Sequence, residues 1–443
     1  MPRPSYQEFA AWGGAGVTHG GGDRCYSMDV VRHFLVAAAL VAALHGNAAA
    51  KTKVDVEGAQ AILAVQRLDG WLLVQTGSQN QVAAALVGPS GTTSLQWFYF
   101  IPAQGTPTAV VHQSEAALFQ GITGQVVQYT DSRDLKKRLK GVLKGVRKVA
   151  MEYAPASKIP ALNRVDAATM KMVRGLGLKV SSSAELVQFT KSLWGPDGRV
   201  AHYVAIHHLT RLKDAALAHL AAELRAGRPV SELDLQELIQ KGYEVRGLEG
   251  PPPVVAAGAN TADPGYVPSP QKWSPIKEGD LLVLDLSARV AGGERPVYAR
   301  LGWVAFVGDA VPDKFSQPFG QVAAARDAAI KFIDDRIQHR RVVKGFEPDQ
   351  QARAALVKAK IGEFPHPLGH SLDTSLKGDG ANIDDHDTHD TRNLVMGAGF
   401  TIGPGVYTKG EFGMRSVVDV YIGRRGVEVT SPTQQQVTAV LEK

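Results

Sequence analysis

Short apolar runs bounded by Gly, Pro or Ser alternate with longer amphipathic stretches, and this grouping constrains the fold most strongly. The runs 70–74, 95–101 and 107–112 predict strands. Residues 134–148 place apolar side chains on one face with a period of 3.6 and predict a helix. The 46 Gly, 24 Pro and 44% hydrophobic residues exclude collagen, a coiled coil and global disorder.

The first fifty residues do not resemble a folded element. After Met28 and a charged start, an apolar run at 34–44 leads into small residues at 45–50, just before Lys51. This order is typical of a signal peptide, and the run is too short to span a bilayer. We therefore predict that 1–27 is a misread start, that 28–50 is a signal peptide, and that the mature protein is exported, periplasmic or extracellular. The single cysteine, Cys25, excludes an intrachain disulfide. Since no cysteine lies beside the predicted cleavage site, we expect no lipid anchor.

The remaining chain divides near residue 185. The first part, 51–184, predicts an α/β domain, and the second, 185–443, an α+β domain in which helices pack on one curved antiparallel sheet. A capping-box pattern at 182–185 predicts a helix that Gly195 and Pro196 end. Longer helices are expected over 197–226, 231–241, 315–336 and 349–360, and strands over 280–286, 297–307, 400–407 and 417–422.

The charge is mildly basic, with 49 Lys and Arg against 43 Asp and Glu, a net charge of +6 and a pI near 9.2. We interpret this charge as spread along the chain and too weak to indicate nucleic acid. The helix at 134–148 has a basic outer face. An ordinary solvated face is preferred there over a membrane-surface or polyanion site. The basic residues of that face are Lys136, Lys137, Arg138, Lys140, Lys144 and Arg147.

Six ordered segments of the second part resemble the pita-bread metallopeptidases, in the Xaa-Pro dipeptidase and Xaa-Pro aminopeptidase branch. Further segments at 69–73, 97–103, 151–155 and 164–166 are similar to that family's creatinase-like N-terminal domain. The resemblance covers nearly all of 55–430 and implies a creatinase-like α/β domain followed by a pita-bread domain. The six segments are 254–264, 284–286, 297–299, 366–370, 402–407 and 413–416.

The resemblance also implies five metal ligands: two Asp, one His and two Glu. In that family two divalent ions generate a hydroxide nucleophile and stabilise the oxyanion of the scissile peptide. Asp285 and His370 match the first Asp and the His, but the other three positions are Arg300, Gly403 and Val417. Gly and Val have no donor atom, and Arg brings a permanent positive charge. We therefore expect no cofactor, or at most one weakly bound Mn, Co or Zn ion.

Arg300 suggests what replaces the metals. A buried Asp285 without a cation would be costly. Since Arg300 lies on the next strand, we expect its guanidinium to occupy the vacant metal volume and neutralise Asp285. An Arg cannot lower the pKa of a bound water as a metal does. The sequence therefore predicts a peptidase-like protein that lacks ordinary two-metal turnover, a pseudoenzyme that binds a peptide or small-molecule ligand.

The groups that handle substrate in the family are also depleted. Of three expected non-ligand histidines only His366 remains, as a candidate catalytic residue, while Gly265 and Lys377 stand at the other two positions. The family is commonly dimeric, so a homodimer is expected. A scaffold for dimerisation is a third hypothesis for the function. The predicted substrate groove is lined by Tyr266, Trp303, Lys377, Tyr407 and Arg415, beside His366 and His370.

Two catalytic alternatives stay open. One is an active Xaa-Pro dipeptidase or aminopeptidase with a rebuilt or single-metal site that adds ligands to Asp285 and His370. The run 384–390 has ligand-type residues, although a solvated acidic loop is preferred there. The other is a metal-free creatinase-like hydrolase, which Gly265 at the relevant histidine position disfavours. The candidate additional ligands are Asp373, His386, Asp387, His389 and Asp390.

Overall fold

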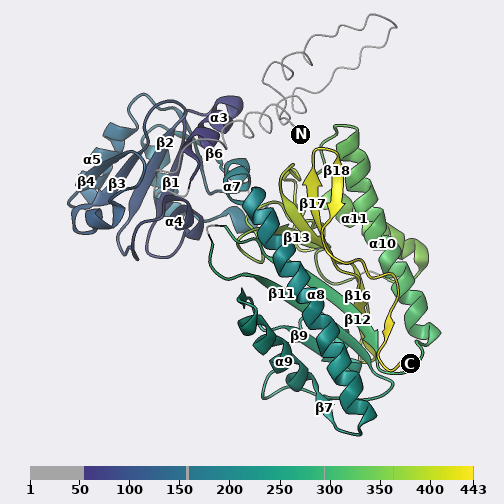
Figure 1. The fold of residues 1–443 in the computed structure, drawn as a ribbon. Coiled ribbons are helices and arrows are strands. Elements are labelled where there is room, and N and C mark those ends of the chain that lie inside the picture. The colour runs from purple at the N-terminus through teal and green to yellow at the C-terminus, as the bar shows by residue number, and fades with distance from the viewer. Residues whose placement is uncertain (1–53, 156–158, 294, 363, 443) are drawn as a thin grey trace, which may run out of the picture.

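The computed structural model describes residues 54–155, 159–293, 295–362 and 364–442. The predicted misread start, the predicted signal peptide and Cys25 lie outside these residues. Figure 1 shows two lobes, an N-terminal domain drawn in purple and blue and a larger C-terminal domain drawn in teal, green and yellow. None of the helices in the described ranges is long and apolar enough to cross a membrane.

The N-terminal domain is a six-stranded mixed sheet between two layers of helices, with the strand order β4-β3-β2-β1-β5-β6. Alternation along β1 sends Trp71 and Leu73 into the core beneath α3 and α4, and Leu72 and Val74 into the core beneath α5 and α6. The strands are β1 (Gly70–Gln75), β2 (Trp97–Pro102), β3 (Thr108–His112), β4 (Gln125–Tyr129), β5 (Lys148–Met151) and β6 (Lys179–Ser182).

Aspartate side chains start three of the helices that cover this sheet. Asp55 accepts the Gly58 amide before α3 (Val56–Gln66), Asp131 caps α5 (Ser132–Val142), and Asp166 caps α6 (Ala167–Gly175). The helix α4 (Gln81–Val87) is capped by Asn80. These caps fix the helix starts, because a carboxylate or amide oxygen satisfies amides that have no partner within the helix.

The junction between the domains lies at β6 and α7 (Ala184–Lys191). The predicted capping box at 182–185 is wrong: Ser183 makes no side-chain cap, and its hydroxyl instead donates to the buried carboxylate of Glu152 at 3.0 Å. A capping box forms later, between Ser231 and Asp234 at the start of α9 (Glu232–Val245). The long helix α8 (Pro196–Arg225) begins with proline at a position where no amide hydrogen is needed.

The C-terminal domain has two main sheets where the sequence predicted one. The first has the order β19-β12-β11-β8, with β9 also paired to β11, and the second has the order β13-β14-β17-β18. The predicted strand at 400–407 is split at Gly403 and Pro404 into β14 and β15, because proline interrupts the ladder. The strands of these two sheets and of the β15–β16 hairpin are β8 (Leu248–Glu249), β9 (Val254–Ala257), β11 (Leu281–Val290), β12 (Ala299–Phe306), β13 (Gly369–Leu372), β14 (Gly399–Ile402), β15 (Gly405–Thr408), β16 (Phe412–Arg415), β17 (Val418–Gly423), β18 (Gly426–Val429) and β19 (Thr438–Ala439).

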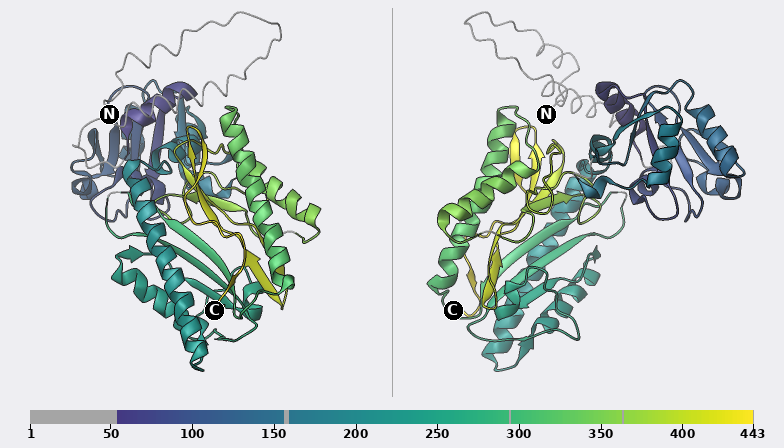
Figure 2. Two further views of the ribbon diagram at one scale, coloured as in Figure 1. Left: turned by 45° about the vertical axis from the view of Figure 1, so that its right-hand side comes forward. Right: turned by 180° about the vertical axis from the view of Figure 1, so that it is seen from behind.

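Helices cover the outer sides of these sheets. Buried residues of α8 and α9 pack on β11 and β12, and α10 (Asp313–Gln338) and α11 (Phe346–Ala359) pack in the other core with β14 and β17. Figure 2 shows the strands running between the long helices α8 and α10. The two sheets meet where the carboxylate of Asp419 on β17 accepts the backbone amide of Arg300 on β12 at 2.7 Å. The candidate site is built at this meeting point.

Candidate functional site

Asp285 and Arg300 lie on neighbouring antiparallel strands, β11 and β12. Asp285 is opposite Gly302, and Arg300 is opposite Ser287, so the two side chains are diagonal neighbours on one face of the sheet. Arg300 Nε donates to Asp285 Oδ1 at 2.8 Å, and Arg300 Nη2 donates to Asp285 Oδ2 at 2.5 Å. Both oxygens of the carboxylate are therefore held by one guanidinium.

This ion pair is largely shielded from solvent, with side-chain exposures of 18% for Arg300 and 12% for Asp285. Burial alone would raise the pKa of Asp285, but the Arg300 guanidinium holds it below its ordinary value. The pKa of Arg300 is raised by the same pairing, which outweighs its burial. Both groups are thus charged and neutralise each other.

A second guanidinium, Arg415 on β16, approaches the same carboxylate. Its Nη1 lies 3.8 Å from Asp285 Oδ2, its Nε donates to the Tyr407 hydroxyl, and its Nη2 donates to the Pro264 carbonyl at 3.0 Å. Tyr407 also lies 2.9 Å from His366 Nε2. Arg415, Tyr407 and His366 therefore form one chain of polar contacts beside the ion pair.

The hydrogen bonds determine the tautomers of both histidines. His366 Nδ1 is 2.8 Å from the Pro367 carbonyl, and His370 Nδ1 is 3.0 Å from the Ser371 carbonyl. A carbonyl only accepts, so Nδ1 carries the hydrogen in each ring and Nε2 has the lone pair in the neutral form. The Tyr407 hydroxyl then donates to His366 Nε2.

Both imidazoles are neutral at physiological pH. Burial, followed by the charge of Arg415, lowers the pKa of His366 to about 3. Burial, followed by the charge of Arg300, lowers the pKa of His370 to about 4. His366 is thus a poor proton acceptor where the sequence suggested a catalytic residue.

Asp419 is a carboxylate of this site that the sequence analysis missed. Its Oδ2 accepts the Arg300 amide, while its Oδ1 is buried with no hydrogen-bond partner. Burial raises the pKa of Asp419 to about 8. The missed signal was an acidic residue inside the apolar run 417–422, two residues after Val417 and hence on the same side of an extended segment.

Val417 and two glycines fill the space where two further carboxylates were expected. A Cβ atom added at Gly403 would lie 3.0 Å from Val417 Cγ2, and one added at Gly302 would lie 2.6 Å from the same methyl. Val417 is 3% exposed. We call Val417, Gly302 and Gly403 the valine plug, since an apolar side chain packs directly over the two glycines.

The residues present do not fit a pair of divalent ions. Both Asp285 oxygens are engaged by Arg300, and the valine plug offers no donor atom. A cation placed beside two guanidiniums would also be repelled. Within the described ranges, no group of three or more His, Cys, Asp or Glu is arranged to hold a metal ion.

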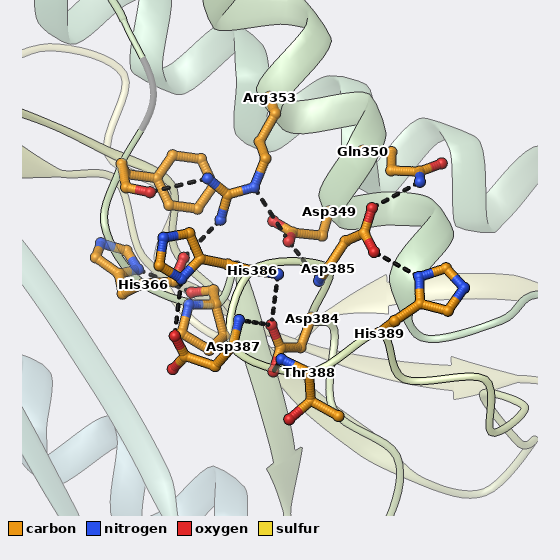
Figure 3. A network of polar contacts seen from close by, with 12 residues as sticks. Asp349, Gln350, Arg353, His366, Asp384, Asp385, His386, Asp387, Thr388 and His389 are labelled. Atoms are coloured by element: carbon orange, nitrogen blue, oxygen red, sulfur yellow. Dashed lines mark hydrogen bonds and ion pairs between the residues drawn. The ribbon is translucent and has the colours of Figure 1, made fainter. Parts of the chain in front are cut away.

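The carboxylates of the run 384–390 accept hydrogen bonds from nearby backbone amides and side chains, several of which Figure 3 shows. Asp384 accepts the amides of His386, Asp387 and Thr388 at 2.8 to 3.0 Å. Asp385 joins His389 Nδ1 to Gln350 of α11. Asp390 pairs with Arg392, and Asp373 accepts amides of Ser375 and Asp379. These carboxylates have the structural roles expected of a polar loop.

Three of the five predicted groove residues lie at or near the site, and two do not. Tyr407 and Arg415 lie at the site, and the exposed Lys377 acts on His370 through its charge. Trp303 is wrongly predicted as a groove residue, because it packs on the other face of the sheet with Lys213 of α8, 3.9 Å from its ring. Tyr266 is 3% exposed, and its hydroxyl is 2.5 Å from the buried Glu232. Tyr266 therefore fixes its loop.

A cluster on Asp379 joins the two domains beside Lys377. Arg164 of the N-terminal domain donates to Asp379 Oδ1 at 2.9 Å, and Lys191 of α7 lies 2.6 Å from Oδ2. Arg392 Nη1 donates to the Asp379 carbonyl at 3.2 Å. One partly buried ion pair, Arg164–Asp379, thus links the N-terminal domain to the segment beside the candidate site.

Comparison with known proteins agrees with this architecture. The family model for metallopeptidase family M24 matches residues 205–424, and the comparison with curated proteins gives no match.

Solved structures share the fold over most of the chain. A dipeptidase PepE from Mycobacterium ulcerans is 20% identical with a TM-score of 0.65, covering 92% of this chain and 98% of that one. A prolidase from Thermococcus sibiricus is 19% identical with a TM-score of 0.60, covering 89% and 100%. An X-Pro aminopeptidase from Thermotoga maritima is 18% identical with a TM-score of 0.61, covering 87% and 99%. Residues 205–424 therefore match metallopeptidase family M24, and the chain has the pita-bread fold, preceded by an N-terminal α/β domain.

Proposed function

We propose that this chain is an exported, non-catalytic member of its family, which binds a peptide or small ligand and does not hydrolyse it by a two-metal mechanism. The observation that carries the proposal is the two-point pairing of Arg300 with Asp285. In a two-metal peptidase the corresponding volume must hold cations that activate water. Here a guanidinium, which cannot be deprotonated near neutral pH, supplies the positive charge.

The charges at the site favour an anionic group on the ligand. Arg300 and Arg415 both face Asp285, and Lys377 is close enough for its charge to act on His370. The two histidines are neutral, so they do not offset or add to this charge. A peptide carboxylate or a small anion would be attracted by the resulting excess of positive charge.

Metal content and turnover, measured on one preparation, test the catalytic half of the proposal. The protein is loaded separately with Mn²⁺, Co²⁺ and Zn²⁺, desalted, and analysed for bound metal. Hydrolysis of Ala-Pro and of an Xaa-Pro-Xaa tripeptide is then followed. We expect less than one ion per chain and no metal-dependent turnover. Two ions per chain with turnover would overturn the proposal, and one ion with turnover would support a rebuilt site.

A restored variant provides the positive control. Arg300→Asp combined with Gly403→Glu and Val417→Glu returns the three missing ligands and removes the valine plug. We expect this variant to bind divalent ions that the parent does not bind. If it folds but takes up no metal, the assignment of these three positions is wrong.

Calorimetric titration tests ligand binding by the unmodified protein. We expect Ala-Pro to bind without being consumed, and its C-terminal amide to bind at least tenfold more weakly, because the amide lacks the carboxylate charge. Equal affinity for the two compounds would contradict the anionic preference, while leaving the absence of turnover as a separate result.

A further inference from the structure

The positive charge of this protein is concentrated in one segment of the N-terminal domain. Residues 131–179 contain thirteen Lys and Arg but only four Asp and Glu, so this segment carries more net positive charge than the +6 of the whole chain. The expectation of a charge spread evenly along the sequence is therefore wrong. The rest of the chain is slightly acidic.

The fold gathers these cations on one outer surface. Leu135 and Leu139 of α5 and Val173 of α6 enter the same core, so both helices cover the same face of the sheet and direct their other sides outward. Strands β5 and β6 are parallel, with Lys148 opposite Lys179, so the segments leading into them meet at one rim. We call the following exposed residues the basic face: Lys136, Lys137, Lys140, Lys144, Arg147, Lys171, Arg174 and Lys179.

The nearby carboxylates are already occupied by backbone or other groups. Asp131 and Asp166 cap α5 and α6, and Asp69 accepts the amides of Arg147 and Lys148. Asp134 pairs with Arg138, which is not counted in the basic face. Among the residues that the structure describes, no ion pair involves a member of the basic face; Arg174 lies over the Tyr153 ring at 5.3 Å.

Such a surface is unlike an ordinary solvated helix face, where charges of both signs alternate. Eight like charges repel one another, and this repulsion is relieved when the surface meets a dense array of negative charge. The members are Lys and Arg on long aliphatic stems, with no aromatic ring among them on which bases could stack. These properties suit a planar layer of phosphate headgroups better than a single nucleic-acid strand.

We infer that the basic face adsorbs the protein, through charge, onto an anionic phospholipid surface. Figure 1 shows α5 on the outside of the N-terminal domain, on the side away from α8 and the C-terminal domain. Adsorption through this face would leave the site at Asp285 free for its ligand. The inference concerns peripheral adsorption and requires no lipid anchor. It does not depend on the proposed function.

Vesicle co-sedimentation of the full chain tests the inference. The probes are vesicles of phosphatidylcholine alone and of equimolar phosphatidylcholine and phosphatidylglycerol, at low ionic strength. We expect binding to the anionic vesicles only, with at least a tenfold loss in about 0.3 M salt, where the Debye length is shorter. Failure to bind the anionic vesicles, or equal binding to both kinds, would overturn the inference.

Matched charge reversals locate the surface. The first variant combines Lys136→Glu, Lys137→Glu, Lys140→Glu and Lys144→Glu, and we expect it to lose at least tenfold in vesicle binding. The control makes the same change of net charge at exposed lysines of the C-terminal domain. Its affinity for the anionic vesicles, corrected for the lower net charge, should be within about twofold of that of the parent. Its four changes are Lys241→Glu, Lys331→Glu, Lys358→Glu and Lys409→Glu.

Two further measurements test whether the loss of binding comes from misfolding and whether another polyanion binds better than lipid. A milder variant, Lys136→Gln with Lys137→Gln, should fold as the parent does by circular dichroism and show an intermediate loss. Single-stranded RNA and poly-glutamate are compared with vesicles at equal ionic strength. Tighter binding of either polymer than of the anionic vesicles, or equal losses in the reversal variant and its control, would refute a lipid surface as the occupant.

Discussion

Two regions of this molecule are rich in the residue types that bind metals, yet they stabilise their carboxylates in different ways. At the site, Asp285 is held by the charge of Arg300. In the loop 384–390, Asp384 is held by three neutral backbone amides. The comparison shows that the density of Asp and His in a sequence does not define a metal site. What matters is whether the carboxylate oxygens are left for the ion.

The largest loss of stability expected from a substitution comes from removing the cation at the site. Arg300→Ala leaves Asp285 buried without its main partner and should lower the free energy of unfolding by about 3 kcal/mol, as measured by urea denaturation. Replacing both partners, Arg300→Met with Asp285→Leu, should recover most of that loss. Arg138→Ala removes a half-exposed partner of Asp134 and should cost at most about 1 kcal/mol. Equal losses in Arg300→Ala and Arg138→Ala would contradict a buried, charged pair.

The pH dependence of stability should reveal Asp419. Its pKa is raised to about 8 in the folded protein, so between pH 4 and 8 the folded state holds a proton that the unfolded state has lost. Stability from this group therefore falls as pH rises, with a slope of up to about 1.4 kcal/mol per pH unit. Asp419→Asn should remove that slope.

The two buried histidines change the pH dependence of stability in the opposite direction to Asp419, so the contribution of Asp419 must be measured as a difference between two proteins. His366 and His370 have lowered pKa values of about 3 and about 4, so they cost stability as the pH falls below about 6.5, where the unfolded chain binds protons first. Subtracting the Asp419→Asn profile from that of the parent cancels these terms. A flat difference between pH 5 and 7 would mean that Asp419 is ionised in the folded state.

The loop should respond less strongly and without any dependence on metal. Asp384→Ala removes the acceptor of three amides and should cost about 1 to 2 kcal/mol, with faster hydrogen exchange at residues 386–388. Addition of Mn²⁺ should leave the melting temperature of both proteins unchanged. A metal-dependent rise in the parent that Asp384→Ala abolishes would instead make this loop an ion site.

The smallest effect is expected at the polar chain beside the ion pair. Tyr407→Phe removes the hydroxyl that joins Arg415 to His366 and should cost about 1 kcal/mol. The hydroxyl donates to the unprotonated nitrogen of His366, so its loss should raise the pKa of that ring, measurable by NMR titration. An unchanged pKa would show that Tyr407 does not donate to His366.

The sequence was sufficient for the parts of the fold and site that depend on local pattern. It predicted the strands that hold Asp285 and Arg300, and the pairing of these two residues is confirmed. The long helices at α8, α10 and α11 also lie close to their predicted ranges. Periodicity and neighbouring strands carry this information, because they act over few residues.

The parts that the sequence did not predict depend on contacts between distant segments. Asp419 reaches the site only because β17 docks beside β12, 119 residues away along the chain. Trp303 is an exception, because it lies three residues from Arg300 on β12 and alternation along a strand already sends the two side chains to opposite faces. Tyr266 was assigned to the groove because its partner, Glu232, lies 34 residues upstream. The contact partners of Asp419 and Tyr266 lie far away along the sequence, so local pattern does not identify them.

The valine plug has an evolutionary consequence. A glutamate regained at Gly403 alone would meet the methyl groups of Val417, and one regained at Val417 alone would gain no metal while Arg300 holds Asp285. Neither change therefore completes a metal site until the other ligands are in place. If the proposed function is right, a two-metal centre could arise in this chain only through several simultaneous substitutions, because no stepwise path offers selection an intermediate that holds metal.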